Sequence, residues 1–175
     1  MSKIGICGSM SVGKTTLVKE LGKLPEFEGY LLATERSGYL KSLGIPLNTD
    51  STFLGQTVFL AERASELLYD NLLTDRTIID VMAFTRQSKS MRVVKKIIFE
   101  EYAKHIILEY DHIFYISTKG VNIEDNGVRE INSIYRTLID KTILNILKEY
   151  SVPHTLIDTT NMEDRISIVL NEITS

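Results

Sequence analysis

The sequence predicts an α/β protein in which a mainly parallel sheet of five strands lies between two layers of helices. Helical patterns alternate with short β-rich runs along the 175 residues, an order typical of parallel strands joined by helices. A glycine-rich pattern joins the first of these runs to the first helical pattern, as it does in phosphate-binding loops. The length leaves room for one domain with a core and little room for a second. We therefore expect a single domain over residues 1–175.

The first half of the chain is expected to hold three strands and three helices. The apolar run Ile4-Gly5-Ile6-Cys7 predicts a strand at residues 3–7. The helix after it is expected to end near residue 23, because Pro25 cannot continue a helix. The segment Gly-Tyr-Leu-Leu-Ala-Thr predicts a second strand within residues 29–34. The other expected elements of this half are a short helix through Leu43, a long helix from Asp50 or Ser51 to about Leu73, and a third strand at residues 76–80.

The second half is expected to add two strands, three helical regions and a lid. The apolar segment His-Ile-Phe-Tyr-Ile-Ser predicts a strand at residues 112–117. The polar stretch after it contains Gly120 and Gly127, which let the chain hinge, so residues 118–131 are expected to form a small mobile lid. The other expected elements are helical segments over 83–109, a helix over 130–150, a strand over 154–158 and a final helix over 162–173.

Residues 8–15 read G-x-x-x-x-G-K-T, with every required position of the phosphate-binding pattern filled. Gly8 and Gly13 let backbone N–H groups turn toward phosphates where a Cβ would clash. Lys14 is expected to reach the β- and γ-phosphates, and the Thr15 hydroxyl to ligate Mg²⁺. The pattern therefore predicts a site for ATP and Mg²⁺. Its expected residues are Gly8, Ser9, Met10, Ser11, Val12, Gly13, Lys14, Thr15 and Thr16.

Other features narrow the class of phosphate-binding protein. GTPases carry an Asp-x-x-Gly and an Asn-Lys-x-Asp element, and neither occurs here. The chain is short for a motor ATPase with a separate helical domain. A net charge of -3 argues against a general nucleic-acid coat, and no apolar run approaches the ~20 residues of a membrane span. A single cysteine, Cys7, rules out an internal disulfide. The glycine loop begins at Gly8, before a leader could be complete, so no signal peptide is expected and a cytoplasmic location is favoured.

Several segments outside the glycine-rich loop fit one kinase class. They are Ala33-Thr34-Glu35-Arg36 after the second strand, Gln56 in the long helix, Thr77-Ile78-Ile79-Asp80 in the third strand, Gly127-Val128-Arg129 and Tyr135-Arg136 around the lid, and Leu156 to Asn161 after the last strand. Together with the loop they resemble the P-loop nucleoside and nucleotide kinases, and more narrowly the ribosylnicotinamide-kinase-like branch of small AAA-type proteins. The resemblance covers nearly the whole chain. It implies a P-loop kinase fold and transfer of the γ-phosphate of ATP to a nucleoside or nucleotide, such as a deoxynucleoside or its monophosphate.

The same resemblance implies an acceptor site with two carboxylates. Glu35 would orient the acceptor hydroxyl or take its proton, with Arg36 beside it. Gln56 would face the acceptor, and Arg63 shares its helical face. Asp80 would lie near both Mg²⁺ and the acceptor. One departure concerns an Asp-Arg-Ser segment that deoxynucleoside kinases usually carry after the third strand. Here Asp-Arg-Thr, residues 75–77, stands at the start of the expected third strand.

On the donor side, the resemblance implies that arginines close on the phosphates. Arg129 and Arg136 would supply positive charge from the lid as water is expelled. They could equally form surface ion pairs with Glu130 and Asp140. Asn161 belongs to the segment that would lie against the donor adenine.

Five basic residues fall within eleven positions: Arg86, Lys89, Arg92, Lys95 and Lys96. Spacings of three and four place most of them along one side of a helix. That side is either a solvated face or a surface for an acidic acceptor.

The sequence therefore leaves three functions open: a kinase with a small-molecule acceptor, a kinase acting on a nucleotide or modified base within DNA or RNA, and a P-loop ATPase without an acceptor. Assembly as a homodimer is also left open.

Overall fold

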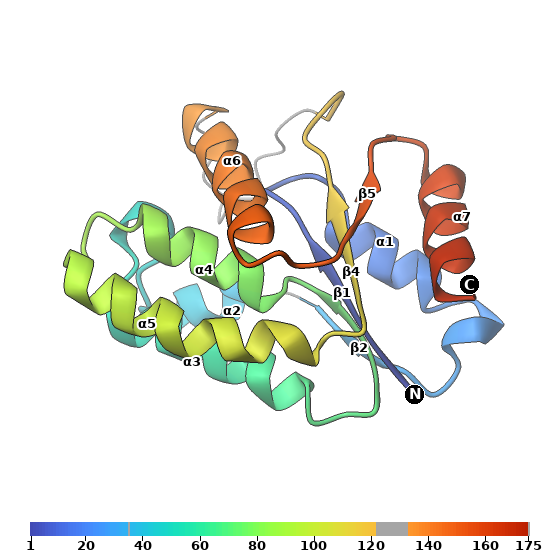
Figure 1. The fold of residues 1–175 in the computed structure, drawn as a ribbon, viewed down its shortest axis with the longest axis horizontal. Coiled ribbons are helices and arrows are strands. Elements are labelled where there is room, and N and C mark those ends of the chain that lie inside the picture. Colours follow the sequence, from blue (N-terminus) through green and yellow to red (C-terminus); the bar gives the residue numbers. More distant parts are fainter. Residues whose placement is uncertain (35, 122–132, 175) are drawn as a thin grey trace.

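Five parallel strands form the centre of the fold (Figure 1). The computed structural model describes residues 1–34, 36–121 and 133–174, and within them the strand order is β2-β3-β1-β4-β5. All four strand pairings are parallel, which confirms the predicted sheet. The strands are β1 (Ser2–Cys7), β2 (Leu31–Ala33), β3 (Asn71–Asp75), β4 (His112–Ile116) and β5 (Thr155–Ile157).

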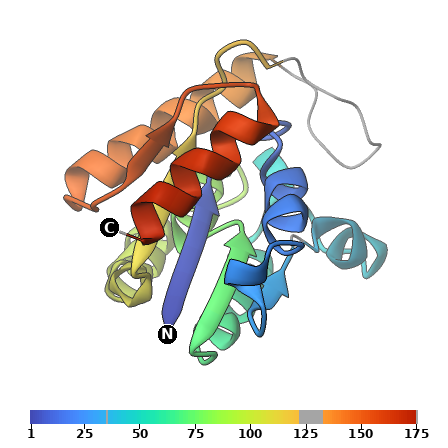
Figure 2. The same cartoon turned by 90° about the vertical axis from the view of Figure 1, so that its right-hand side faces the viewer.

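Helices cover both faces of this sheet, as predicted for a three-layer α/β/α fold (Figures 1 and 2). One face carries α1 (Lys14–Leu21) and α7 (Met162–Ile173), which lie side by side. The other face carries α3 (Phe53–Glu66), α4 (Ile78–Gln87), α5 (Val93–Ile106) and α6 (Ser133–Glu149). The shorter elements are α2 (Ser37–Ser42) and three 3₁₀ turns at Pro25–Phe27, Asn48–Asp50 and Ile107–Glu109.

The core is divided by the sheet into two apolar clusters. In β4, Ile113 and Tyr115 pack on the side of α3 to α6, while Phe114 and Ile116 pack on the side of α1 and α7. Successive side chains of a strand point to opposite faces. Because both faces are covered by helices, β4 is apolar at nearly every position rather than at alternate ones.

The predicted third strand at residues 76–80 is wrong. The strand is Asn71–Asp75, and the long helix before it ends at Glu66 rather than near residue 73. The run Thr77-Ile78-Ile79 is β-branched, as in many strands, but it begins α4 instead. Thr77 accepts a hydrogen bond from the Ile79 amide at 3.2 Å, and Asp80 accepts one from the Thr77 amide at 2.8 Å. This capping box outweighs the strand propensity of the run.

The helical segments predicted over 83–109 are two helices, and the first begins earlier than predicted. Helix α4 starts at Ile78, the chain leaves the helical conformation after Gln87, and α5 begins at Val93. Most of the predicted lid, residues 122–131, lies outside the described residues. Its first part, residues 118–121, is a turn in which the Val121 amide donates to the Thr118 carbonyl and Gly120 has a φ of 71°.

Candidate functional site

The phosphate loop, residues 8–15, connects the central strand β1 to α1. Strand β1 lies between β3 and β4, so the loop leaves the sheet where the strand order reverses, a common ligand site in open α/β sheets. Gly8 and Gly13 have φ angles of 149° and 89°. A Cβ on Gly8 would lie 2.8 Å from the Ile116 carbonyl oxygen. The predicted strand, loop and helix are therefore present, with glycine where the backbone requires it.

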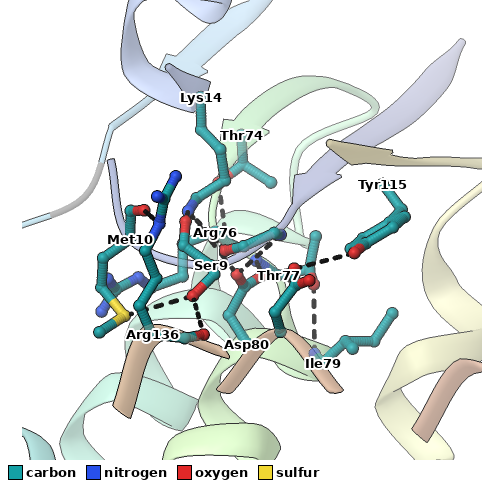
Figure 3. Close-up of polar contacts among 12 residues, drawn as sticks. Ser9, Met10, Lys14, Thr74, Arg76, Thr77, Ile79, Asp80, Tyr115 and Arg136 are labelled. Carbon is teal, nitrogen blue, oxygen red and sulfur yellow. Dashed lines mark hydrogen bonds and ion pairs between the residues drawn. The ribbon is translucent and has the colours of Figure 1, made fainter. Parts of the chain in front are cut away.

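Three cationic side chains hold the carbonyl groups of this loop. The Lys14 ammonium donates to the Gly8 carbonyl at 2.6 Å and to the Ser9 carbonyl at 2.8 Å. Arg136 Nε donates to the Met10 carbonyl at 3.0 Å (Figure 3). Arg165 Nη1 donates to the Val12 carbonyl at 2.7 Å. These bonds fix the orientation of several peptide planes of the phosphate loop, so side chains of the protein order the loop without a bound ligand.

Asp80 fastens the phosphate loop to α4 (Figure 3). Its side chain is fully buried, and its Oδ1 accepts a hydrogen bond from the Gly8 amide at 3.2 Å. Its Oδ2 accepts from the amide and the hydroxyl of Thr77 at 2.8 and 3.0 Å. The Lys14 ammonium lies 4.0 Å from Oδ1. Asp80 is thus beside the phosphate loop as expected, although it stands in the first turn of a helix and not at the end of a strand.

The end of strand β3 brings a second buried acid, Asp75, to a cavity that the phosphate loop also lines. Asp75 is the last residue of β3, pairs in register with Ile6 and is fully buried. Arg76 follows with a φ of 135°, a region that costs a non-glycine residue roughly 1–3 kcal/mol. The Arg76 guanidinium lies over the Phe84 ring, 4.9 Å from its centroid. The Asp-Arg-Thr segment therefore follows β3 directly, and the departure inferred from the misplaced strand disappears.

A cavity opens beside the phosphate loop, and we call it the first cavity. Gln56 of α3 reaches it and is 3% exposed. Asp75 and Arg76 enter from the turn after β3, and apolar side chains of α3 and α4 supply much of the wall. The lining residues are Met10, Ser11, Val12, Gly13, Lys14, Thr15, Ser37, Leu47, Asn48, Gln56, Phe59, Asp75, Arg76, Val81 and Phe84.

Two arginines predicted for the acceptor lie elsewhere. Arg63 is buried two turns beyond Gln56 on α3, about 10 Å further along the helix axis. It forms an ion pair with Glu66 at 2.6 Å. Burial nevertheless outweighs this guanidinium and raises the pKa of Glu66 from 4.5 to about 7. Arg36 lies 3.7 Å from Glu62 and lines a separate groove next to β2. Neither arginine is among the residues that line the first cavity.

Arg136 is the one predicted lid arginine that the structure describes. It belongs to α6, and its Nη1 donates to the Val121 carbonyl at 2.6 Å while its Nε contacts the loop. Its Nη2 is buried and has no hydrogen-bond partner among the described residues. Burial lowers the pKa of this guanidinium. Arg136 thus already contacts the phosphate loop. Arg129 and Glu35 lie outside the described residues.

A second cavity lies beside the phosphate loop. Its lining includes Thr15 and Thr16 of α1, and Gly120 and Thr160 from the segments after β4 and β5. Asn161 caps α7 instead, since its side chain accepts from the Asp164 amide at 3.1 Å. The remaining lining residues are Ser11, Val12, Gly13, Val121, Met162 and Arg165.

Arg165 was missed by sequence reasoning. It lines the second cavity and holds the Val12 carbonyl, although 153 positions separate the two residues. In the sequence it is one more charged residue in a polar helical turn. The only available signal was that it falls within a turn of the segment expected beside the donor base.

The basic residues of α4 and α5 do not share one helix, because Lys89 lies between the two helices and Arg92 caps the second. Arg86 pairs with Glu100 at 2.8 Å and with Glu149 at 2.9 Å. Lys96 donates to the carbonyls of Arg86 and Ser88 at 2.7 and 2.6 Å. Lys95 lies 5.6 Å from the centroid of the Phe53 ring. Arg86 and Lys96 are therefore engaged in contacts within the protein.

Three further findings concern metal ligands, the single cysteine and membrane spans. The described residues hold no group of three or more His, Cys, Asp or Glu side chains arranged to bind a metal by themselves. Cys7 is a buried free thiol, as expected. None of the described helices combines the length and the apolar character needed to cross a bilayer.

A family described as AAA domain matches residues 3–165 of the chain. No curated protein matches the sequence. Among solved structures, the deoxyadenosine kinase of M. mycoides with dCMP and dCDP bound is similar, with a TM-score of 0.71 and 17% identity over 98% of both chains. The same enzyme with dATP bound gives a TM-score of 0.67 at 18% identity, over 99% of this chain and 100% of that one.

The NadR protein in complex with NR is also similar, with a TM-score of 0.75 and 18% identity. The match covers 97% of this chain and 51% of the NadR chain, so the chain spans about half the length of NadR. These likenesses confirm the P-loop kinase fold that the sequence predicted, and the matching family model agrees with the AAA-type branch named in the prediction.

Proposed function

Because the chain belongs to the AAA domain family and has the fold of the nucleoside kinases, we propose that it transfers the γ-phosphate of ATP to a nucleoside or nucleotide. The observation that carries this proposal is the first cavity. It joins Lys14 and Thr15 of the phosphate loop to Gln56, Asp75 and the apolar side chains of α3 and α4. A molecule held there would present its hydroxyl to the end of a triphosphate bound in the loop.

The walls of the first cavity suit a base and its sugar. Phe59 and Phe84 offer flat apolar surfaces, and Gln56 offers both an amide donor and an acceptor for a base edge. Asp75 is placed to accept the proton of a sugar hydroxyl or to orient it. A P-loop ATPase without an acceptor has no need of such a pocket next to its γ-phosphate.

The loop supplies most of the catalytic charge in this proposal. Lys14 would move from the Gly8 and Ser9 carbonyls to the β- and γ-phosphates when ATP binds. Mg²⁺ fits the donors present: the hydroxyl of Thr15 and the carboxylate of Asp75 line one cavity, with Asp80 beside them. When bound, the ion would neutralise charge on the transferred phosphoryl group. Asp80 would keep the loop in place through the Gly8 amide.

Two observations favour a deoxynucleoside as the acceptor. The Asp-Arg-Thr segment follows β3, where deoxynucleoside kinases usually carry Asp-Arg-Ser. The deoxyadenosine kinase of M. mycoides is also similar over its whole length, whereas NadR is similar over about half. A polynucleotide acceptor is less favoured, since Arg86 and Lys96 make internal contacts. A cytoplasmic location and a homodimer stay predictions.

The test is a panel of acceptors incubated with Mg²⁺ and γ-labelled ATP. The panel contains the four deoxynucleosides, their monophosphates, nicotinamide riboside and a short oligonucleotide. We expect transfer to at least one deoxynucleoside or its monophosphate, and transfer at least about 10²-fold slower by the Lys14→Ala variant. Transfer to the oligonucleotide alone would favour the polynucleotide kinase, and acceptor-independent release of phosphate would favour the ATPase.

A further inference from the structure

Arg165 occupies an unusual position for a charged side chain. It is the fourth residue of α7 and is 3% exposed. Its Nη1 donates to the Val12 carbonyl and its Nε donates to the Thr159 carbonyl, both at 2.7 Å. One guanidinium thus joins the phosphate loop to the segment between β5 and α7.

No carboxylate among the described residues lies within ion-pairing distance of Arg165. Burial lowers the pKa of its guanidinium, and no neighbouring acid counters that shift. Buried Arg63 is paired with Glu66, and the partly buried Arg86 with Glu100 and Glu149. Buried Arg136, which also holds a carbonyl of the phosphate loop, resembles Arg165 in having no ion pair with a described carboxylate. A buried charge is costly unless an opposite charge compensates it. The counter-charge of Arg165 is therefore expected to come from a ligand.

The surroundings of Arg165 indicate which ligand that is. A Cβ on Gly13 would lie 2.8 Å from Nη1, so the guanidinium packs directly against the backbone of the phosphate loop. Arg165 also lines the second cavity with Thr15 and Thr16, whose amides open helix α1 and attract anions. Thr160, from the segment after β5, lines the same cavity. The guanidinium thus stands between a phosphate cradle and a wall provided by the segment after β5.

We infer that Arg165 is a positioning residue of the nucleoside triphosphate site, where it ties the segment at Thr159 and Thr160 to the phosphate loop and offers a fixed positive charge to the triphosphate. The inference rests on the proposed function, since it takes the loop to bind ATP. It deepens that function, because it makes the C-terminal helix part of the donor site. Because Arg165 bonds to both Thr159 and Val12, a movement of the segment after β5 would also move the phosphate loop at Val12. The part of the site expected beside the base and the part beside the phosphates are therefore linked.

The experiment compares Arg165→Met, Arg165→Lys and Arg86→Met. Methionine keeps the length of the side chain and removes its charge and its donors, while lysine keeps the charge. Arg86 is the matched control, because it is a partly buried arginine that is hydrogen-bonded within the protein but lines neither the first nor the second cavity. Binding of Mg·ATP and of inorganic tripolyphosphate is measured by calorimetry, and the melting temperature is recorded with and without Mg·ATP.

We expect Arg165→Met to weaken both Mg·ATP and tripolyphosphate by about 10- to 100-fold, the range for a lost hydrogen bond to a charged group. Arg165→Lys should recover part of that loss. Arg86→Met should lower the melting temperature without ligand and keep the rise caused by Mg·ATP.

Normal Mg·ATP and tripolyphosphate affinity in a folded Arg165→Met protein would overturn this inference and leave the proposed function standing. A lower melting temperature without ligand, with unchanged affinity for both ligands, would likewise overturn the inference, because Arg165 would then act on folding alone. If the unmodified protein itself fails to bind Mg·ATP, the proposed function falls, and the inference falls with it.

Discussion

The two sides of the phosphate loop are built from very different stretches of sequence. The proposed cradle for the triphosphate uses residues 8–16, a single contiguous segment held by Lys14 from within and by two arginines from α6 and α7. The first cavity shares loop residues 10–15 with the cradle, and the rest of its wall comes from α2, α3, α4, the end of β3 and the segment before α3. Its walls come together only because these elements pack on one face of the sheet (Figure 1).

The difference shows in how each side handles charge. On the loop, carbonyl groups are turned toward cations, so positive charge is present before any ligand arrives. In the first cavity the buried acid Asp75 lines the wall together with the polar Gln56 and the apolar Phe59, Val81 and Phe84. Donor binding is therefore expected to depend mainly on electrostatics, and acceptor choice on shape and a few hydrogen bonds.

The largest effect should come from the loop itself. Lys14→Ala is expected to reduce phosphoryl transfer by about 10²- to 10³-fold or more, because no nearby group replaces its ammonium on the β- and γ-phosphates. The measurement is single-turnover transfer at saturating ATP, with circular dichroism as the check on folding. Normal turnover by a folded Lys14→Ala protein would contradict the view that the donor side depends on the charge of the loop, because that charge would then be dispensable.

The two buried acids should separate chemistry from architecture. Asp75→Asn is expected to lower turnover by about 10²-fold with a small change in stability, because its carboxylate faces the first cavity. Asp80→Asn is expected to lower the free energy of unfolding by about 1–3 kcal/mol, since its oxygens accept from Gly8 and Thr77. Urea unfolding and steady-state rates of both variants check this. Equal losses of stability in the two variants would contradict it.

A smaller effect is expected at Gln56, which lines the first cavity. Gln56→Leu keeps the volume and removes the amide, so KM for the acceptor should rise by about 10-fold while KM for ATP stays the same. Steady-state kinetics with each substrate varied in turn measures the two constants. The matched control is Arg63→Met on the same helix, which should act on stability through Glu66. A change in KM for ATP but not for the acceptor would place Gln56 on the wrong side of the loop.

The smallest effect on phosphoryl transfer is expected at Glu66, which lines neither cavity and acts on stability through pH. Burial raises the pKa of Glu66 from 4.5 to about 7. The folded protein then binds a proton more tightly than the unfolded chain, so the stability contributed is full below pH 4.5 and is lost as the pH rises through about 7. Glu66→Gln should reduce the fall in unfolding free energy between pH 5 and pH 8 by about 2 kcal/mol. Urea titrations at both pH values measure it, and identical falls in both proteins would contradict it.

The sequence alone determined the phosphate loop, the parallel α/β class and the order of most elements. These follow from local rules: the glycines, Lys14 and Thr15 stand in one eight-residue pattern, and the apolar runs have the periods of strands and helices. Local rules also explain the main error. Thr77 and Asp80 contain a capping signal, but the β-branched residues between them favoured a strand, and only packing decides between two plausible local structures.

Tertiary structure decided everything that depends on contacts between distant residues. Gln56 and Arg63 share a helical face, yet only Gln56 reaches the first cavity, because the cavity does not extend two turns further along α3. Asp80 reached the loop by way of a helix start and not a strand end, and Asp75 took the strand end. Arg165 contacts Val12 across 153 positions. No spacing rule reports such a contact, because it exists only once α7 has packed beside α1 on the sheet.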